Sequence, residues 1–110
     1  MDEIFDSAVR TTGDLAGVFE YDSDTAYFYL YETGGGTGQR VLDSIHVFSG
    51  EPDFAKTDVS IRWDSEEQKV GLFIKGVLWA AFDCGHGTKY GGSYKPGGKP
   101  SLPSGAEGGF

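Results

Sequence analysis

Cysteine and basic residues are both scarce in this sequence. The 110 residues include one cysteine, Cys84, whereas extracellular domains of this size usually carry an even set of disulfide-bonded cysteines. Nine Lys and Arg stand against 17 Asp and Glu, which leaves a formal net charge of −8. Nucleic acids and anionic membranes bind clustered Lys and Arg, so this deficit argues against both and favours a basic protein partner.

Long apolar runs are also missing. No stretch approaches the roughly 20 apolar residues that span a bilayer. The N-terminus, Met-Asp-Glu-Ile-Phe-Asp, is acidic where a signal peptide carries basic residues, and no apolar segment follows it. Together with the single cysteine, these features predict a cytoplasmic protein. The length leaves room for one domain with one hydrophobic core.

Glycine and aromatic residues are abundant instead, and both favour β structure. There are 18 Gly, and aromatic residues make up 15% of the chain. Apolar residues alternate with polar ones between turn-forming clusters, while Glu51-Pro52-Asp53 is typical of a short helical turn. We predict a mainly β fold, an antiparallel meander that forms a curved sheet, a small sandwich or an open barrel. Its strands number about six, over residues 17–21, 26–32, 40–49, 59–63, 70–74 and 77–83.

The composition changes after Cys84. Residues 1–84 contain six Lys and Arg against 16 Asp and Glu, a net charge of −10, whereas residues 85–110 contain three Lys against one Glu, a net charge of +2. The second segment also holds nine Gly and three Pro, with few bulky apolar side chains to order it. We predict one compact acidic β domain over residues 1–84 and a Gly/Pro-rich tail over residues 85–110, either flexible or docked on the domain.

Tyrosines alternate with other apolar residues in the strand predicted over residues 26–32. Tyr27, Tyr29 and Tyr31 fall on one face of this strand, while Phe28 and Leu30 fall on the other. Because tyrosine is enriched at protein interfaces, the tyrosine face is a candidate binding surface. Packing in the core explains the same pattern equally well.

Three carboxylates, Glu20, Asp22 and Asp24, alternate through the first predicted hairpin. Alternate oxygen ligands are typical of calcium loops, but the Asp-x-Asp-x-Asp-Gly pattern and the closing Glu are missing. Aspartate also caps backbone N–H groups in turns. We therefore interpret these residues as an acidic part of the candidate binding surface. The glycine-rich loop 34–38 that follows lacks the Gly-Lys-Ser/Thr of a phosphate-binding loop and is predicted to join two strands.

One cysteine and two histidines form the main candidate for chemistry. Cys84 and His86, with His46 elsewhere in the chain, could form a thiol nucleophile with its base, or a zinc site with one carboxylate. The CxxC and HxxxH spacings that support zinc sites are missing. We predict no catalytic residue, no metal and no cofactor, with Cys84 ending a strand and His86 exposed.

Four segments together resemble a small family of uncharacterised bacterial domains of unknown function. They are Val18-Phe19-Glu20-Tyr21-Asp22 leading into residues 24–29, then residues 42–47, 59–64, and 72–76 running to 81–83. The resemblance covers residues 17–83 and implies a bacterial origin and one compact β-rich domain. It implies no activity, substrate or catalytic residue.

Three functions remain open at this point. The first is a non-catalytic protein-binding module, comparable to an immunity protein or an inhibitor, that meets a basic partner; we favour it on the acidic charge and the tyrosine face. The second is a small metal- or thiol-dependent enzyme that uses Cys84 and His86. The third is a structural module that associates with itself, for example as a homodimer through an exposed sheet edge.

Overall fold

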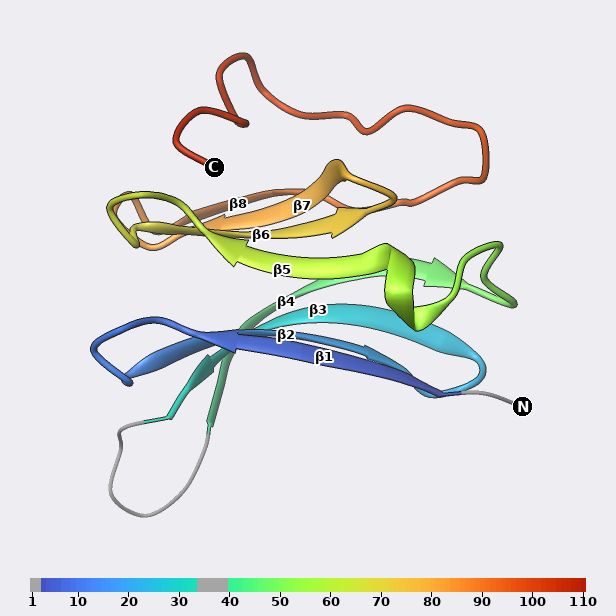
Figure 1. The fold of residues 1–110 in the computed structure, drawn as a ribbon, viewed down its shortest axis with the longest axis horizontal. Coiled ribbons are helices and arrows are strands. Elements are labelled where there is room, and N and C mark those ends of the chain that lie inside the picture. Colours follow the sequence, from blue (N-terminus) through green and yellow to red (C-terminus); the bar gives the residue numbers. More distant parts are fainter. Residues whose placement is uncertain (1–2, 34–39) are drawn as a thin grey trace.

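The computed structural model describes residues 3–33 and 40–110, which form two four-stranded antiparallel sheets stacked face to face (Figure 1). The strands of each sheet pair in chain order, and one 3-10 turn, η1 (Lys56–Asp58), lies in the connection between the sheets. The first sheet contains β1 (Ile4–Val9), β2 (Leu15–Tyr21), β3 (Thr25–Glu32) and β4 (Arg40–Ser49). The second sheet contains β5 (Val59–Trp63), β6 (Lys69–Ile74), β7 (Val77–Asp83) and β8 (Thr88–Gly91).

This architecture confirms the predicted mainly β fold, and the small sandwich is the arrangement found among the three predicted. The six expected strands correspond to β2 through β7, and η1 follows shortly after Glu51-Pro52-Asp53, where a short helical turn was expected. Two strands are additional: β1 lies before the first expected strand, and β8 lies in the segment predicted as a tail. The glycine-rich loop 34–38 lies outside the described residues. No helix among the residues described is long and apolar enough to cross a membrane.

The core lies between the two sheets and follows from the alternation of the strands. Phe28 on β3 is fully buried, and its ring centroid lies 5.1 Å from that of Phe82 on β7. The sheets pack closely at Gly17, where an added Cβ would lie 2.6 Å from Cγ2 of Val70. Removal of these apolar side chains from water is the main force that holds the sheets together. Their buried neighbours include Phe19, Tyr21, Val47, Leu72, Ile74 and Trp79.

After β8, the chain crosses from the second sheet to the edge of the first. The Gly92 N–H donates to the Trp79 carbonyl at 2.8 Å, and the Tyr94 N–H donates to the Val47 carbonyl at 2.7 Å. The Tyr94 ring then packs edge-on against Trp79, with 4.7 Å between ring centroids, and its hydroxyl donates to Asp53 Oδ1. These contacts close the side of the sandwich.

The C-terminal segment then folds back over the outer face of the second sheet (Figure 1). The Phe110 ring packs against Phe73 with 5.3 Å between centroids, and Ala106 is buried in the same cluster. Lys69 fastens this segment by donating to the Gly108 carbonyl at 2.7 Å. The boundary expected at residue 84 therefore falls inside the second sheet, between β7 and β8; independent folding of residues 1–84 stays a prediction.

Candidate binding surface

The outer face of the first sheet differs from that of the second, because no described segment covers it (Figure 1). Phe5 and Val9 of β1 are 54% and 56% exposed on this face. Large apolar side chains of a monomeric domain are rarely gathered on one exposed face unless that face serves an interface. We call this surface the tyrosine face, after the residues at its centre.

The register of the strands aligns the side chains of the tyrosine face in three rows. Tyr27 lies between Glu20 of β2 and His46 of β4, and the rows of Tyr29 and Tyr31 follow. The surface so formed contains Phe5, Ser7, Val9, Glu20, Tyr27, Tyr29, Tyr31, Val41, Ser44 and His46, while Ala16 and Val18 of the same rows are buried beneath their neighbours.

The three tyrosines lie against one another along β3. The ring centroids of Tyr27 and Tyr29 are 5.7 Å apart with nearly parallel planes, and those of Tyr29 and Tyr31 are 5.9 Å apart and edge-on. Burial raises the pKa of the Tyr29 phenol, and the Glu20 carboxylate raises it further, so the hydroxyl remains a donor at neutral pH. Packed tyrosines with few free rotamers provide contact area at low entropic cost.

The three acidic residues predicted in the first hairpin, Glu20, Asp22 and Asp24, do not lie together on one surface. Glu20 is exposed on the tyrosine face beside Tyr27. The Asp22 carboxylate instead caps the β2–β3 turn, because its Oδ1 accepts from the N–H groups of Thr25 and Asp24 at 2.9 and 3.1 Å, which lowers the pKa of Asp22. Asp24 is exposed in the same turn. These three residues therefore combine a turn cap with two solvated charges.

Much of the basic charge is engaged inside the molecule, while several carboxylates of the first sheet are not. Four basic residues form ion pairs with carboxylates and two more lie over aromatic rings: Arg10, Arg40, Lys75 and Lys89, then Arg62 and Lys69. Within the described residues, the first sheet and its turns also hold carboxylates that make no ion pair, namely Glu3, Asp6, Glu20, Asp22 and Asp24. The charge around this sheet is therefore negative.

The cysteine and the two histidines do not come together. His46 lies on β4 of the first sheet, with Nε2 3.0 Å from Ser49 Oγ, whereas Cys84 and His86 follow β7 in the second sheet. The His86 side chain is 82% exposed, and its Nδ1 lies 2.9 Å from Asp83 Oδ2. The part of the chain that the structure describes contains no group of three His, Cys, Asp or Glu that could hold a metal ion.

The Cys84 thiol is expected to react slowly with iodoacetamide at neutral pH. Burial raises its pKa above the usual thiol value, against a smaller opposing effect of Arg10, so less thiolate is present than in a free cysteine. Intact-mass measurement of the alkylation rate against pH should give a half-maximal rate at a higher pH than for a cysteine-containing peptide. Unfolding in urea should restore the peptide value; a lower pH of half-maximal rate in the folded protein would revive the thiol-enzyme alternative.

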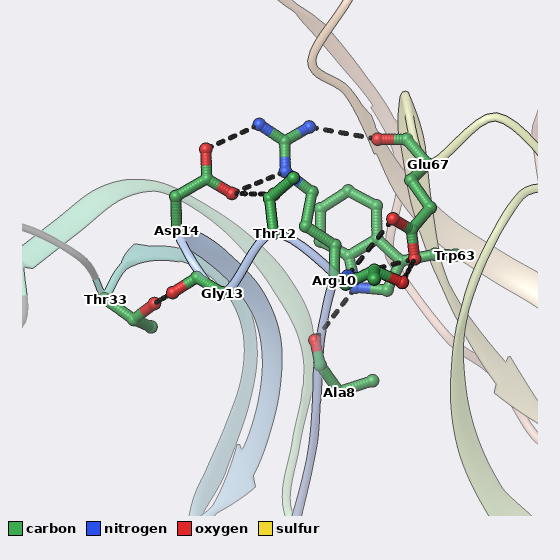
Figure 2. A network of polar contacts seen from close by, with 9 residues as sticks. Ala8, Arg10, Thr12, Gly13, Asp14, Thr33, Trp63 and Glu67 are labelled. Atoms are coloured by element: carbon green, nitrogen blue, oxygen red, sulfur yellow. Dashed lines mark hydrogen bonds and ion pairs between the residues drawn. The ribbon is translucent and has the colours of Figure 1, made fainter.

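A polar network joins the β1–β2 turn to the β5–β6 turn (Figure 2). The Arg10 guanidinium donates twice to the Asp14 carboxylate, at 2.7 and 2.8 Å, and once to the Glu67 carbonyl at 3.0 Å. The same contacts hold the pKa of Asp14 well below its usual range. Trp63 Nε1 donates to the Ala8 carbonyl at 2.9 Å beneath the guanidinium. Because three N–H donors of the guanidinium bond to groups within the protein and join two turns, we interpret this network as a structural link between the sheets.

The contribution of β1 to the tyrosine face was not predicted from the sequence. Phe5, Ser7 and Val9 alternate with Ile4, Asp6 and Ala8, which is the two-residue period of a strand. The apolar residues of this segment, Ile4, Phe5, Ala8 and Val9, follow a helical spacing and do not alternate with polar ones. The local pattern therefore favours a helix, and the strand forms through its pairing with β2, which is a contact with another segment.

The fold and this surface define a small β-sandwich module in which the C-terminal segment covers one sheet face and no part of residues 3–33 and 40–110 covers the other. The chain belongs to the family described as uncharacterized protein conserved in bacteria (DUF2251), whose model matches residues 2–101. This match confirms the predicted resemblance and extends beyond residues 17–83 at both ends, so it includes β1 and β8. No curated protein and no solved structure matches the chain.

Proposed function

We propose that this protein is a non-catalytic binding module that docks a basic protein on the tyrosine face. The observation that carries this proposal is the uncovered position of three mutually packed tyrosines beside Phe5 and Val9, which are 54% and 56% exposed. Aromatic side chains with an apolar body and a polar tip are common anchors of protein interfaces. The bacterial cytoplasm is the compartment that we propose for this encounter, on the single free thiol of Cys84.

The negative charge of the surface favours a basic partner. Glu20 lies within the tyrosine face, and Glu3, Asp22 and Asp24 lie at the end of the same sheet. A basic partner gains from these carboxylates, whereas a second copy of this acidic chain would place like charges against one another. This repulsion disfavours the homodimer alternative, which light scattering over a range of concentrations tests directly. A monomer at every concentration is expected.

The enzyme alternative receives less support. The family description assigns no activity. The thiol of Cys84 has a raised pKa, the His86 imidazole pairs with Asp83 through Nδ1, and His46 belongs to the other sheet. A thiol nucleophile needs a lowered pKa and a base within reach, so neither requirement is supported here.

Replacing all three tyrosines by serine is expected to abolish capture of the basic partner. The substitutions remove the central anchors of the surface while leaving the inward residues of β3, including Phe28, unchanged. The measurement is affinity capture from a lysate of the source bacterium at low and high salt, read by mass spectrometry. Wild type should enrich a basic protein that high salt releases, and the Tyr27→Ser/Tyr29→Ser/Tyr31→Ser variant should lose it.

The matched control is Val77→Ser, which changes an apolar residue that is 42% exposed in the second sheet. This control should retain the partner. Equal capture by the triple variant and by wild type would assign the interface elsewhere. Absence of any salt-released basic protein from the wild-type capture would contradict the proposed function itself.

A further inference from the structure

A pocket of about 780 Å³ opens at the end of the sandwich where β1 begins and β2 ends. The connection between the two sheets forms its other side. Its apolar walls come from Ile4, Pro52 and Phe54, and its charged groups are Glu3, Glu51 and Lys56. The pocket therefore combines apolar walls with two carboxylates and one ammonium group.

Tyr21 also lines this pocket, and its hydroxyl is the unusual feature. The residue is 1% exposed, and no polar atom among residues 3–33 and 40–110 lies within hydrogen-bond distance of its Oη. Buried polar atoms almost always have a partner, because leaving one unpaired costs the free energy of its desolvation. A ligand bound in the pocket could supply the missing hydrogen-bond partner of the Tyr21 hydroxyl.

The surroundings of this hydroxyl are negative. Burial raises the pKa of the Tyr21 phenol, and the charges of Glu51, Asp24 and Asp22 raise it further. The phenol therefore stays neutral, and its oxygen keeps lone pairs for an incoming donor. An anionic ligand would meet these carboxylates, whereas a cation would be attracted by them.

We infer that the Tyr21 pocket binds a guanidinium or ammonium head carried on an alkyl stem. The head would donate to the Tyr21 hydroxyl and to the carboxylates of Glu3 and Glu51, while the stem would lie along the walls formed by Ile4 and Phe54. This inference goes beyond the proposed interface, because the pocket is a separate site and its test needs no protein partner. The same chemistry is offered by a free amine and by an arginine or lysine side chain of a protein.

Arginine amide is the probe that tests this inference, and its counterpart is citrulline amide, which keeps the same α-amine but lacks the guanidinium charge. Titration of isotope-labelled protein, followed by two-dimensional NMR, should shift signals of residues 3–4, 21 and 51–56 with arginine amide. Citrulline amide should bind at least about tenfold more weakly, because it lacks the charge. Equal binding of the two probes, or no shift at these residues, would overturn the inference.

Three variants assign the binding to the pocket. Tyr21→Phe keeps the ring and its packing but should weaken arginine amide about tenfold, and Glu51→Gln should weaken it similarly. Lys56→Gln removes the one basic group of the pocket and should strengthen binding severalfold. The unfolding midpoint of each variant shows that the fold is intact. Unchanged affinity in Tyr21→Phe and Glu51→Gln would overturn the inference even if the probe binds elsewhere.

A short peptide with one arginine between glycines separates the two sources of the ligand. Binding as tight as that of arginine amide would support a side chain of a partner protein as the natural ligand. Markedly weaker binding would support a free small amine. Because these titrations contain no partner protein, loss of partner capture on the tyrosine face and loss of probe binding in the pocket are independent results.

Discussion

Replacing Gly91 with alanine is expected to lower the free energy of unfolding by at least about 3 kcal/mol. Gly91 has φ +91°, a left-handed conformation that residues with a Cβ rarely adopt, and an added Cβ would lie 2.2 Å from the Trp79 carbonyl oxygen. That neighbour is backbone of β7, so the crossing of the chain from the second sheet to the first would have to shift. Urea unfolding followed by tryptophan fluorescence measures the loss.

Gly97→Ala is the matched control for this prediction. Gly97 also has a positive φ, +71°, but no atom lies within 4 Å of an added Cβ. Only the backbone strain is then introduced, at a cost of about 1 kcal/mol. If both variants lost the same stability, a Cβ at residue 91 would not meet the Trp79 carbonyl, and this prediction would be wrong.

A second large effect is expected at Gly17, where β2 packs closely against the second sheet. Gly17→Ala should destabilise the protein by about 3 kcal/mol, because the new Cβ would lie 2.6 Å from Cγ2 of Val70 and 3.1 Å from Cγ2 of Ile61. Both neighbours are short branched side chains with little freedom to move. Thermal and urea unfolding of the variant measure the change.

The Val70→Ala variant tests whether contact with Val70 causes this loss of stability. Alone, it should destabilise by about 2 kcal/mol through the cavity that it leaves. In the Gly17→Ala/Val70→Ala double variant the deleted methyl group makes room for the added one, so the loss should be about 3 kcal/mol rather than the sum of about 5. Strict additivity would show that Gly17 and Val70 do not face each other across the core.

The strands were predictable from the sequence where one period was unambiguous. In β5, Val59, Ile61 and Trp63 alternate with polar Ser60 and Arg62, and the structure places that strand over these residues. β8 carries no such signal, because Thr-Lys-Tyr-Gly has one large apolar residue in four positions. It forms through backbone pairing with β7, a contact that no local pattern encodes.

The position of the tyrosines on one face of β3 was predictable, but their exposure was not. Both faces of β3 are apolar, so the local sequence favours covering either one. The outcome depends on the C-terminal segment, which packs on the second sheet through Leu102, Ala106 and Phe110. Residues so widely spaced give no periodicity, and the choice of sheet is a long-range contact. The Tyr21 pocket was missed for the same reason, since residues 3–4, 21 and 51–56 line it and are far apart in the sequence.

The pairing of strands in chain order affects the rate at which the protein folds. Each pairing joins strands that are neighbours in the sequence, as in β1–β2, β2–β3 and β5–β6. The entropy of closing a loop is small for such short connections, and rates of folding rise as the mean sequence separation of contacts falls. We therefore expect this sandwich to fold faster than Greek-key sandwiches of similar length. The first sheet ends at residue 49, so we expect its four strands to pair with one another during synthesis, before the residues of the second sheet have emerged from the ribosome.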